Sequence, residues 1–261
     1  MQPMANIALR AARRAADYIA QSFDRPDERQ VQLKGRNDFV SDVDQRAEQI
    51  IISVIQAAYP DHAILGEESG IVGNPESDHT WIIDPLDGTL NFLHSIPHFA
   101  VSIGVQKGKH LEHGVIVDPI RNEEFVASRG HGAQLNGKRI RVTACTKLTD
   151  AVIAAGIPPG SLSRLDAYSR CLHTFTSEAR AIRRAGSAAL DLAYVAAGRI
   201  DTFWEPGLSK WDIAAGIVLV REAGGFVSDL GGGEGYWDTG DIIATNPKLL
   251  KPVVQITKAA F

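Results

Sequence analysis

Acidic residues in this sequence gather where short apolar segments end. Segment 82–89 (IIDPLDGT) begins as an apolar strand, and its proline is expected to break that strand and place Asp84 and Asp87 in a turn. Two carboxylates three positions apart across such a turn can bind one cation, and the Leu86 carbonyl group can join them. The amide groups after Gly88 are expected to begin a helix, and a helix N-terminus favours a phosphate oxygen.

Two further segments share this pattern. Segment 65–70 (LGEESG) is an apolar run that ends in Glu67, and segment 211–216 (WDIAAG) places Asp212 in the first turn of an apolar helix. A solvated loop explains Glu67 alone, helix capping explains Asp212 alone, and turn chemistry explains the aspartate pair. Together, several acids at the borders of apolar elements would repel one another unless a cation lay among them.

The ligand types favour a hard cation. Carboxylate and carbonyl oxygens suit Mg²⁺ or Mn²⁺. The eight histidines show no zinc-type pairing, and Cys145 and Cys171 lie far apart, so zinc is disfavoured and a reducing compartment is favoured. Two hard cations that share these carboxylates would polarise a phosphoryl oxygen, lower the pKa of a bound water and stabilise the leaving oxygen. The residues therefore predict metal-assisted hydrolysis of a phosphate ester.

The elements that must position these acids follow from hydrophobic periodicity. Helical spacing predicts helices over residues 4–19 and 47–58, joined by a polar connection over residues 26–32. Strands are predicted over residues 80–83, 98–105, 111–117 and 123–127. Beyond residue 146, predicted strands at 151–155, 200–204 and 242–244 alternate with predicted helices at 162–176, 188–197, 213–222 and 247–257. The glycine run 231–235 is predicted to be a loop without a phosphate-binding role, because no Lys-Ser/Thr pair follows it.

Strands that alternate with helices predict stacked α and β layers. We expect one compact catalytic unit with two halves. Residues 1–145 form an α+β half with most of the acids described above, and residues 146–261 form an α/β half that carries Asp212.

Composition narrows the function classes. The formal net charge is −4, which disfavours direct binding of nucleic acid through broad electrostatic attraction. No segment approaches the ~20 consecutive apolar residues that cross a bilayer, and the N-terminus lacks a signal-type apolar stretch. We therefore expect a soluble, cytoplasmic protein that does not contact membranes.

Three motifs carry a resemblance to a known family. The sequences GEES at 66–69, DPLDGT at 84–89 and WDIAAG at 211–216, in this order, resemble those of the inositol monophosphatase family of lithium-sensitive, magnesium-dependent phosphatases. The resemblance runs nearly end to end, and PHFAVS at 97–102 and GSAALDLA at 186–193 resemble the SuhB-type bacterial members. It implies a layered αβαβα sandwich, which is also the fold of fructose bisphosphatases.

The resemblance also implies which residues bind metal. Glu67, Asp84 and the Leu86 carbonyl would hold a first Mg²⁺, and Asp84, Asp87 and Asp212 would hold a second. A third, weaker ion would be reached by Glu67 and water molecules, so two to three ions are expected per site, with Mn²⁺ as a substitute.

The remaining implied roles concern the attacking water and the substrate. Asp44 and Thr89 resemble the pair that orients the water, and Lys34 lies where the family carries a lysine on a flexible catalytic loop. Glu67 and Lys34 join that pair as expected catalytic residues. The expected substrate-binding residues are Asp87, Gly88, Thr89, Gly186, Ser187, Ala188, Glu205 and Asp212, of which Gly186, Ser187, Ala188 and Glu205 match the positions that meet polyol hydroxyls.

The implied activity is hydrolysis of myo-inositol monophosphate, or a similar polyol phosphate, by direct attack of water. Related substrates remain open, namely 3′-phosphoadenosine 5′-phosphate, fructose bisphosphate and histidinol phosphate, and Lys210 could contact a second anionic group of such a substrate. Aspartyl-phosphate phosphatases also use Asp-Gly-Thr, but their two aspartates are separated by one residue, whereas Asp84 and Asp87 are separated by two.

The resemblance also implies partners. Family members are commonly homodimers. SuhB-type members are associated with ribosomal RNA antitermination through transcription factors and RNA polymerase. An antitermination factor with retained phosphatase activity is therefore the alternative to a purely metabolic enzyme.

Overall fold

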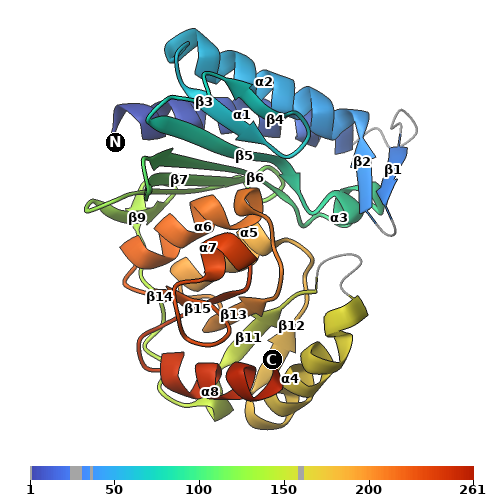
Figure 1. Cartoon of the computed structure of the whole chain (residues 1–261), viewed down its shortest axis with the longest axis vertical. Coiled ribbons are helices and arrows are strands. Elements are labelled where there is room, and N and C mark those ends of the chain that lie inside the picture. The colour runs from blue at the N-terminus through green and yellow to red at the C-terminus, as the bar shows by residue number, and fades with distance from the viewer. Residues whose placement is uncertain (1, 24–30, 36–37, 158–161) are drawn as a thin grey trace.

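The chain folds into five alternating layers. The computed structural model describes residues 2–23, 31–35, 38–157 and 162–261, with the side chains of all of these except residues 31–41 and 162. A helix pair covers an eight-stranded sheet, a second helix pair lies beneath that sheet, and a five-stranded sheet and a third helix pair follow (Figure 1). This order confirms the predicted αβαβα sandwich.

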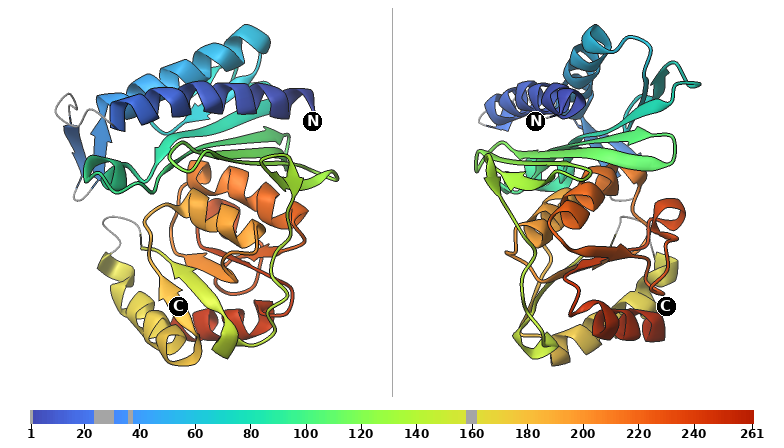
Figure 2. Two further views of the ribbon diagram at one scale, coloured as in Figure 1. Left: turned by 180° about the vertical axis from the view of Figure 1, so that it is seen from behind. Right: turned by 90° about the vertical axis from the view of Figure 1, so that its left-hand side faces the viewer.

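The first layer consists of α1 (Pro3–Phe23) and α2 (Asp42–Ala58), which lie on one face of the large sheet (Figure 2). Alanines at helical spacing let α1 pack closely, and its buried face includes Ala8 and Ala15. Both predicted helices are confirmed. The predicted connection 26–32 lies mostly outside the described residues, and its last two residues belong to a hairpin of β1 (Val31–Gly35) and β2 (Asp38–Ser41).

The eight-stranded sheet has the order β10-β9-β8-β7-β6-β5-β3-β4. Its strands are β3 (Ala63–Gly66), β4 (Gly70–Gly73), β5 (His79–Asp87), β6 (Ala100–Lys107), β7 (His110–Asp118), β8 (Glu123–Ser128), β9 (Gly132–Leu135) and β10 (Lys138–Arg139). Strands β5 to β10 form an antiparallel meander, and β3 pairs parallel with β5. The four predicted strands correspond to β5, β6, β7 and β8.

The predicted break at the proline of segment 82–89 is wrong. Strand β5 continues through Asp87, where α3 (Thr89–Leu93) follows almost at once. Asp84 lies opposite Ser102 of β6, and Asp87 lies opposite Ala100. Three residue positions along β5 therefore correspond to two along β6. This is a β-bulge, and a bulge is one of the few places where a sheet accepts proline.

The lower layers complete the molecule. The central helices are α5 (Ala188–Ala196) and α6 (Lys210–Glu222). The small sheet, of order β12-β11-β13-β15-β14, contains β11 (Val152–Ala155), β12 (Ala181–Arg183), β13 (Thr202–Glu205), β14 (Phe226–Ser228) and β15 (Ile242–Thr245). Its outer face carries α4 (Leu165–Glu178) and α8 (Leu250–Ala260), and the short helices are η2 (Leu148–Asp150), η3 (Leu162–Arg164) and α7 (Tyr236–Thr239). The predicted strands and helices of this half are all present, with shifted ends.

The glycine run 231–235 is a loop, as predicted. Its amide groups are already occupied, because Gly231, Gly233 and Gly235 donate to the Asp229 carboxylate at 2.9, 2.8 and 3.0 Å. These bonds lower the pKa of Asp229 despite its partial burial. Among the described residues, no helix is both long and apolar enough to span a membrane.

Two glycines set how closely α6 approaches the large sheet. A Cβ atom at Gly104 would lie 2.6 Å from the Ala214 side chain, and one at Gly114 would lie 2.3 Å from the Ala215 carbonyl oxygen. Because the latter neighbour is backbone, a methyl group there can be accommodated only if α6 moves. These two glycines therefore determine the distance between the sheet and α6, the helix that carries Asp212.

Replacing Gly114 by alanine is expected to displace α6 and destabilise the fold. Overpacking of this kind costs about 1–3 kcal/mol, which lowers the melting temperature by about 5 °C for a chain of this size. Thermal unfolding followed by circular dichroism measures this shift. An unchanged melting temperature would show that α6 is not held against the sheet by this contact.

Candidate active site

Three carboxylates from two layers converge at one point. Asp84 and Asp87 lie on the bulged end of β5, and Asp212 lies in the first turn of α6, as predicted for that residue. Each offers an oxygen atom, and these atoms all lie within 4.8 Å of one another. The structure thus brings together the two aspartates of the DPLDGT segment and the aspartate of the WDIAAG segment.

The bulge explains why both β5 aspartates face α6. In a regular strand, residues three apart point to opposite faces of the sheet. Here Asp84 and Asp87 lie opposite Ser102 and Ala100, which are two apart on β6 and so share a face. That face is the one toward α6, since the Ser102 hydroxyl lies 3.4 Å from the Trp211 carbonyl oxygen. If the three steps from Asp84 to Asp87 followed a regular strand without a bulge, Asp87 would point toward α1 and α2.

Burial makes this cluster electrostatically unfavourable by itself. Burial, followed by the charges of Glu67, Asp87 and Asp212, raises the pKa of Asp84 well above its usual range. Burial also raises the pKa of Asp87 to about 6 and, together with the Asp87 charge, the pKa of Asp212 to about 7. Within the described residues, no Lys or Arg forms an ion pair with these three aspartates. Oxygen donors with uncompensated negative charge fit a hard divalent cation.

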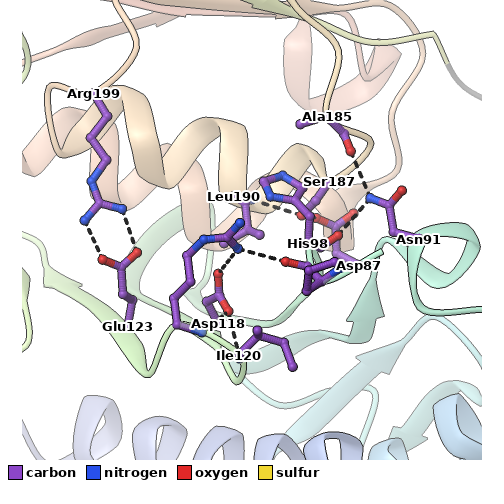
Figure 3. Close-up of polar contacts among 12 residues, drawn as sticks. Asp87, Asn91, His98, Asp118, Ile120, Glu123, Ala185, Ser187, Leu190 and Arg199 are labelled. Carbon is purple, nitrogen blue, oxygen red and sulfur yellow. Dashed lines mark hydrogen bonds and ion pairs between the residues drawn. The ribbon is translucent and has the colours of Figure 1, made fainter. Parts of the chain in front are cut away.

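The N-terminal end of α5 fixes the Asp87 carboxylate. The Ser187 hydroxyl and the Ala189 N–H both donate to Asp87 Oδ2, the latter at 2.8 Å. Ser187 also caps its helix, because its hydroxyl oxygen accepts from Leu190 N at 3.3 Å (Figure 3). Bonds from Ser187, Ala189 and the backbone of Ala188 oppose the rise in the pKa of Asp87. Ser187 and Ala188, expected to meet polyol hydroxyls, therefore also contact a proposed metal ligand.

Glu67 lies beside Asp84. A side-chain hydrogen bond between the two contributes to the raised pKa of Asp84, and the Glu67 amide donates to the Ile83 carbonyl at 3.2 Å. The turn that carries Glu67 is held by Glu48 of α2, whose carboxylate accepts from Glu68 N at 2.8 Å and Ser69 N at 2.9 Å.

Asp44 and Thr89 are in direct contact although 45 positions separate them. Thr89 Oγ1 lies 2.8 Å from Asp44 Oδ1 and 3.0 Å from the Leu86 carbonyl oxygen. A hydroxyl group has one proton, so it donates to one of these oxygens at a time. Asp44 is 1% exposed, in the first turn of α2. The structure thus brings the expected water-orienting pair together next to the aspartate cluster.

Gly88 and Gly186 allow the two halves of the site to meet. Gly88 has φ +96°, and a Cβ atom there would lie 3.0 Å from the His98 carbonyl oxygen and 3.3 Å from that of Gly186. Asn91 bridges the same segments, because its side-chain amide donates to the carbonyl oxygens of His98 at 2.8 Å and Ala185 at 2.9 Å (Figure 3).

Glu205, at the end of β13, adds a further buried carboxylate to the site. It is 8% exposed, and burial, together with the charges of Asp212, Asp191 and Asp87, raises its pKa well above the usual range. A Cβ atom at Gly156 would lie 2.0 Å from its carboxylate, so a side chain there would displace the carboxylate from its present position.

The two lysines singled out from the sequence are placed differently. Lys34 lies on β1, and its side chain is outside the described part of the chain. Lys210 begins α6, and its ammonium group lies 5.3 Å from the ring centroid of Trp237, which is a cation–π contact.

Sequence reasoning missed Glu48 and the bridging role of Asn91. Glu48 could have been found, because Asp44, Glu48, Ile51 and Ile55 follow the i, i+4, i+7, i+11 spacing of one buried helix face. An acid on such a face needs a polar partner. Asn91 gave no comparable signal, because its partners lie on distant loops.

Comparisons with known proteins point to one group. The model of the inositol monophosphatase family matches residues 1–259. A Pseudomonas aeruginosa protein named Nus factor SuhB is 51% identical over 97% of this chain and 95% of its own length. The crystal structure of extragenic suppressor protein suhB from Bartonella henselae is 44% identical, with a TM-score of 0.96 and full coverage of both chains. Inositol monophosphatase from Anabaena is 34% identical, with a TM-score of 0.86 over 98% of this chain and 95% of its own.

Proposed function

The chain belongs to the inositol monophosphatase family, and we propose that it is a Mg²⁺-dependent phosphomonoesterase that hydrolyses myo-inositol monophosphate or a similar polyol phosphate. The observation that carries this proposal is the convergence of Asp84, Asp87 and Asp212 within 4.8 Å. Buried carboxylates this close together are stabilised by cations, and paired hard cations suit phosphoryl transfer.

The proposed ligands of two to three Mg²⁺ ions, with Mn²⁺ as a substitute, are Glu67, Asp84, the Leu86 carbonyl, Asp87 and Asp212. When bound, these ions would supply the positive charge that stabilises the phosphoryl transition state and increases the acidity of the attacking water. Ser187 and the amide groups that begin α5 hold Asp87 in place for that task.

The residues of the chain itself would prepare the water and orient the alcohol. Thr89 Oγ1 would accept a hydrogen bond from the water while it donates its own proton toward Asp44 Oδ1, 2.8 Å away. Gly88 and the segment Gly186–Ala188 would face the substrate from one side and Glu205 from the other. A polyol with several hydroxyl groups suits these surroundings, because carboxylate and carbonyl oxygens accept hydrogen bonds from hydroxyl groups.

A phosphate-release assay tests this proposal. Inositol monophosphate, 3′-phosphoadenosine 5′-phosphate, fructose bisphosphate and histidinol phosphate would each be offered with Mg²⁺, with Mn²⁺ and with EDTA. We expect the highest kcat/KM for inositol monophosphate, no turnover in EDTA, and inhibition by millimolar Li⁺, which has the size of Mg²⁺ and half its charge. A preference for a substrate with two phosphates would favour the alternative in which Lys210 contacts the second anionic group.

A second function is supported by the relatives. The Pseudomonas aeruginosa protein that is 51% identical is named Nus factor SuhB, and the resemblance of this sequence to SuhB-type members implies an association with antitermination. We propose that this chain, as a homodimer, also binds antitermination factors or RNA polymerase. The two functions can coexist, because a protein-binding surface does not require the carboxylate cluster.

The variant Asp87→Asn is expected to separate these functions. It removes one charge from the cluster, so phosphate release should be lost, while partner binding at another surface should remain. Affinity capture from a bacterial lysate with each form, followed by detection of RNA polymerase and Nus factors, measures the second property. Capture of neither by either form would contradict the antitermination role and leave the phosphatase proposal standing.

A further inference from the structure

A separate cavity of about 320 Å³ lies between the β6–β7 hairpin, the C-terminal half of α6 and α7. Its lining includes the cationic side chains of Lys109, Arg129 and Arg221 and the rings of Tyr236 and Trp237. Small-molecule sites have volumes from about 300 Å³ upward, so the cavity is large enough for a compact ligand.

The cavity is cationic although the chain as a whole has a net charge of −4. Glu222 is the one carboxylate among the lining residues, and its two oxygens accept from Gly130 N at 2.8 Å and Gly132 N at 2.7 Å. Within the described part of the chain, no ion pair neutralises Lys109, Arg129 or Arg221. Three positive charges therefore face one carboxylate that is already hydrogen-bonded.

Arg221 and Tyr236, and the backbone of the turn that carries Arg129, are held in place before any ligand binds. Arg221 donates a hydrogen bond to the Tyr236 hydroxyl, and its guanidinium carbon lies 5.6 Å from the centroid of the Tyr236 ring. The bonds from Gly130 N and Gly132 N to the Glu222 carboxylate fix the turn between β8 and β9, at the start of which Arg129 N donates to the Glu112 carbonyl at 2.8 Å. Such preorganisation lowers the entropy cost of binding.

This cavity is distinct from the aspartate cluster. Asp212 lies at the N-terminal end of α6, and Arg221 lies nine positions further along the same helix. At 1.5 Å per residue, the two are separated by about 13 Å along the helix axis. None of the three aspartates is among the residues that line the cavity.

We propose that this cavity binds a small anion that carries a flat ring, with the size and chemistry of a nucleoside monophosphate. Lys109, Arg129 and Arg221 would contact the phosphate, and the Trp237 and Tyr236 rings would contact the base. Guanidinium groups recognise phosphate by paired hydrogen bonds, and aromatic side chains stack on bases. This inference is independent of the proposed catalytic function.

Isothermal titration calorimetry in EDTA tests the proposal. Without divalent cations the aspartate cluster repels anions, so binding measured in EDTA does not report on that cluster. The probes are inosine 5′-monophosphate, inosine and inorganic phosphate. We expect the monophosphate to bind with a Kd of about 1 mM or lower, and each of the other two probes at least tenfold more weakly, because each has only half of the complementary chemistry.

Variants locate the binding. Arg129→Met and Lys109→Met alter exposed side chains, and Trp237→Leu removes the ring, so each should weaken binding of the monophosphate at least tenfold. The matched control is Arg180→Met, because Arg180 is an arginine whose side chain is 65% exposed and lies outside the cavity lining. Circular dichroism confirms that each variant is folded. The proposal is overturned if the monophosphate does not bind, if inosine or phosphate alone binds equally well, or if the three variants bind like the control.

Discussion

Replacing Asp84 by asparagine is expected to lower kcat by at least about 1000-fold while the protein stays folded. Asparagine has nearly the same shape but no charge, so a proposed shared ligand of two ions loses its negative charge. Metal ions contribute several kcal/mol of transition-state stabilisation, and each 1.4 kcal/mol is a factor of ten in rate. The same loss is expected for Asp212→Asn, because that carboxylate lies in the same cluster.

Stability distinguishes a lost ligand from a damaged fold. Burial and the neighbouring acids make a charge at Asp84 unfavourable in the absence of a cation. The variant should therefore melt at the same temperature as the parent protein, or higher, in EDTA. Added Mg²⁺ should stabilise the parent and have less effect on the variant.

The control is Asp78→Asn, which removes an exposed carboxylate just before β5 and should change neither rate nor stability. The two-metal assignment fails if Asp84→Asn keeps near-normal turnover with unchanged Mg²⁺ dependence. It also fails if Mg²⁺ raises the melting temperatures of the parent and the variant equally.

Thr89→Ala is expected to reduce kcat by about 100- to 10,000-fold with little change in KM, the range typical of lost proton-transfer assistance. The methyl group cannot donate to Asp44 Oδ1, which lies 2.8 Å from the Thr89 hydroxyl. Because the missing bond matters most when the water attacks phosphorus, the loss falls on the transition state rather than on substrate binding.

Asp44→Asn should have a similar effect, and the double variant should be scarcely slower than either single variant. Residues that act as one unit give such non-additive losses. Steady-state kinetics of the four proteins complete the cycle. Multiplicative losses in the double variant would show that Asp44 and Thr89 act independently, and an increase in KM alone would assign them to substrate binding.

Much of the fold could be predicted because its long elements carry strong periodic signals. The alanine and isoleucine pattern of the first helix and the short apolar segments of β6 and β7 do not depend on distant partners. The strands β4, β9 and β10, at or next to the edges of the sheet, are short and carry glycine or charge, so their pairing is decided by neighbours that periodicity does not reveal. The bulge at Asp84 could not be told from a break, because proline occurs both at strand ends and at bulges.

The site could be predicted as a set of acids but not as a geometry. The residue types and spacing of Asp84 and Asp87 predict a shared cation without reference to the fold. The hydrogen bond from Ser187 to Asp87 and the support of the Glu67 turn by Glu48 join segments far apart in the chain. Such contacts follow from packing between layers, which local sequence patterns do not encode.

Because of the bulge in β5, the role of one proposed metal ligand, the Leu86 carbonyl group, can be tested by mutation. Side-chain substitution leaves a backbone oxygen in place, so replacing Leu86 would not test its carbonyl group. Pro85 and Leu86 have no paired partner on β6, and the register resumes only at Asp87. Deleting Pro85 alone would close the bulge and bring Leu86 back into the ladder opposite Val101. Asp84 and Asp87 would then be two positions apart instead of three and would stay on the same face. A single-codon deletion thus changes the backbone donor while it retains every carboxylate, which no point mutation at this site achieves.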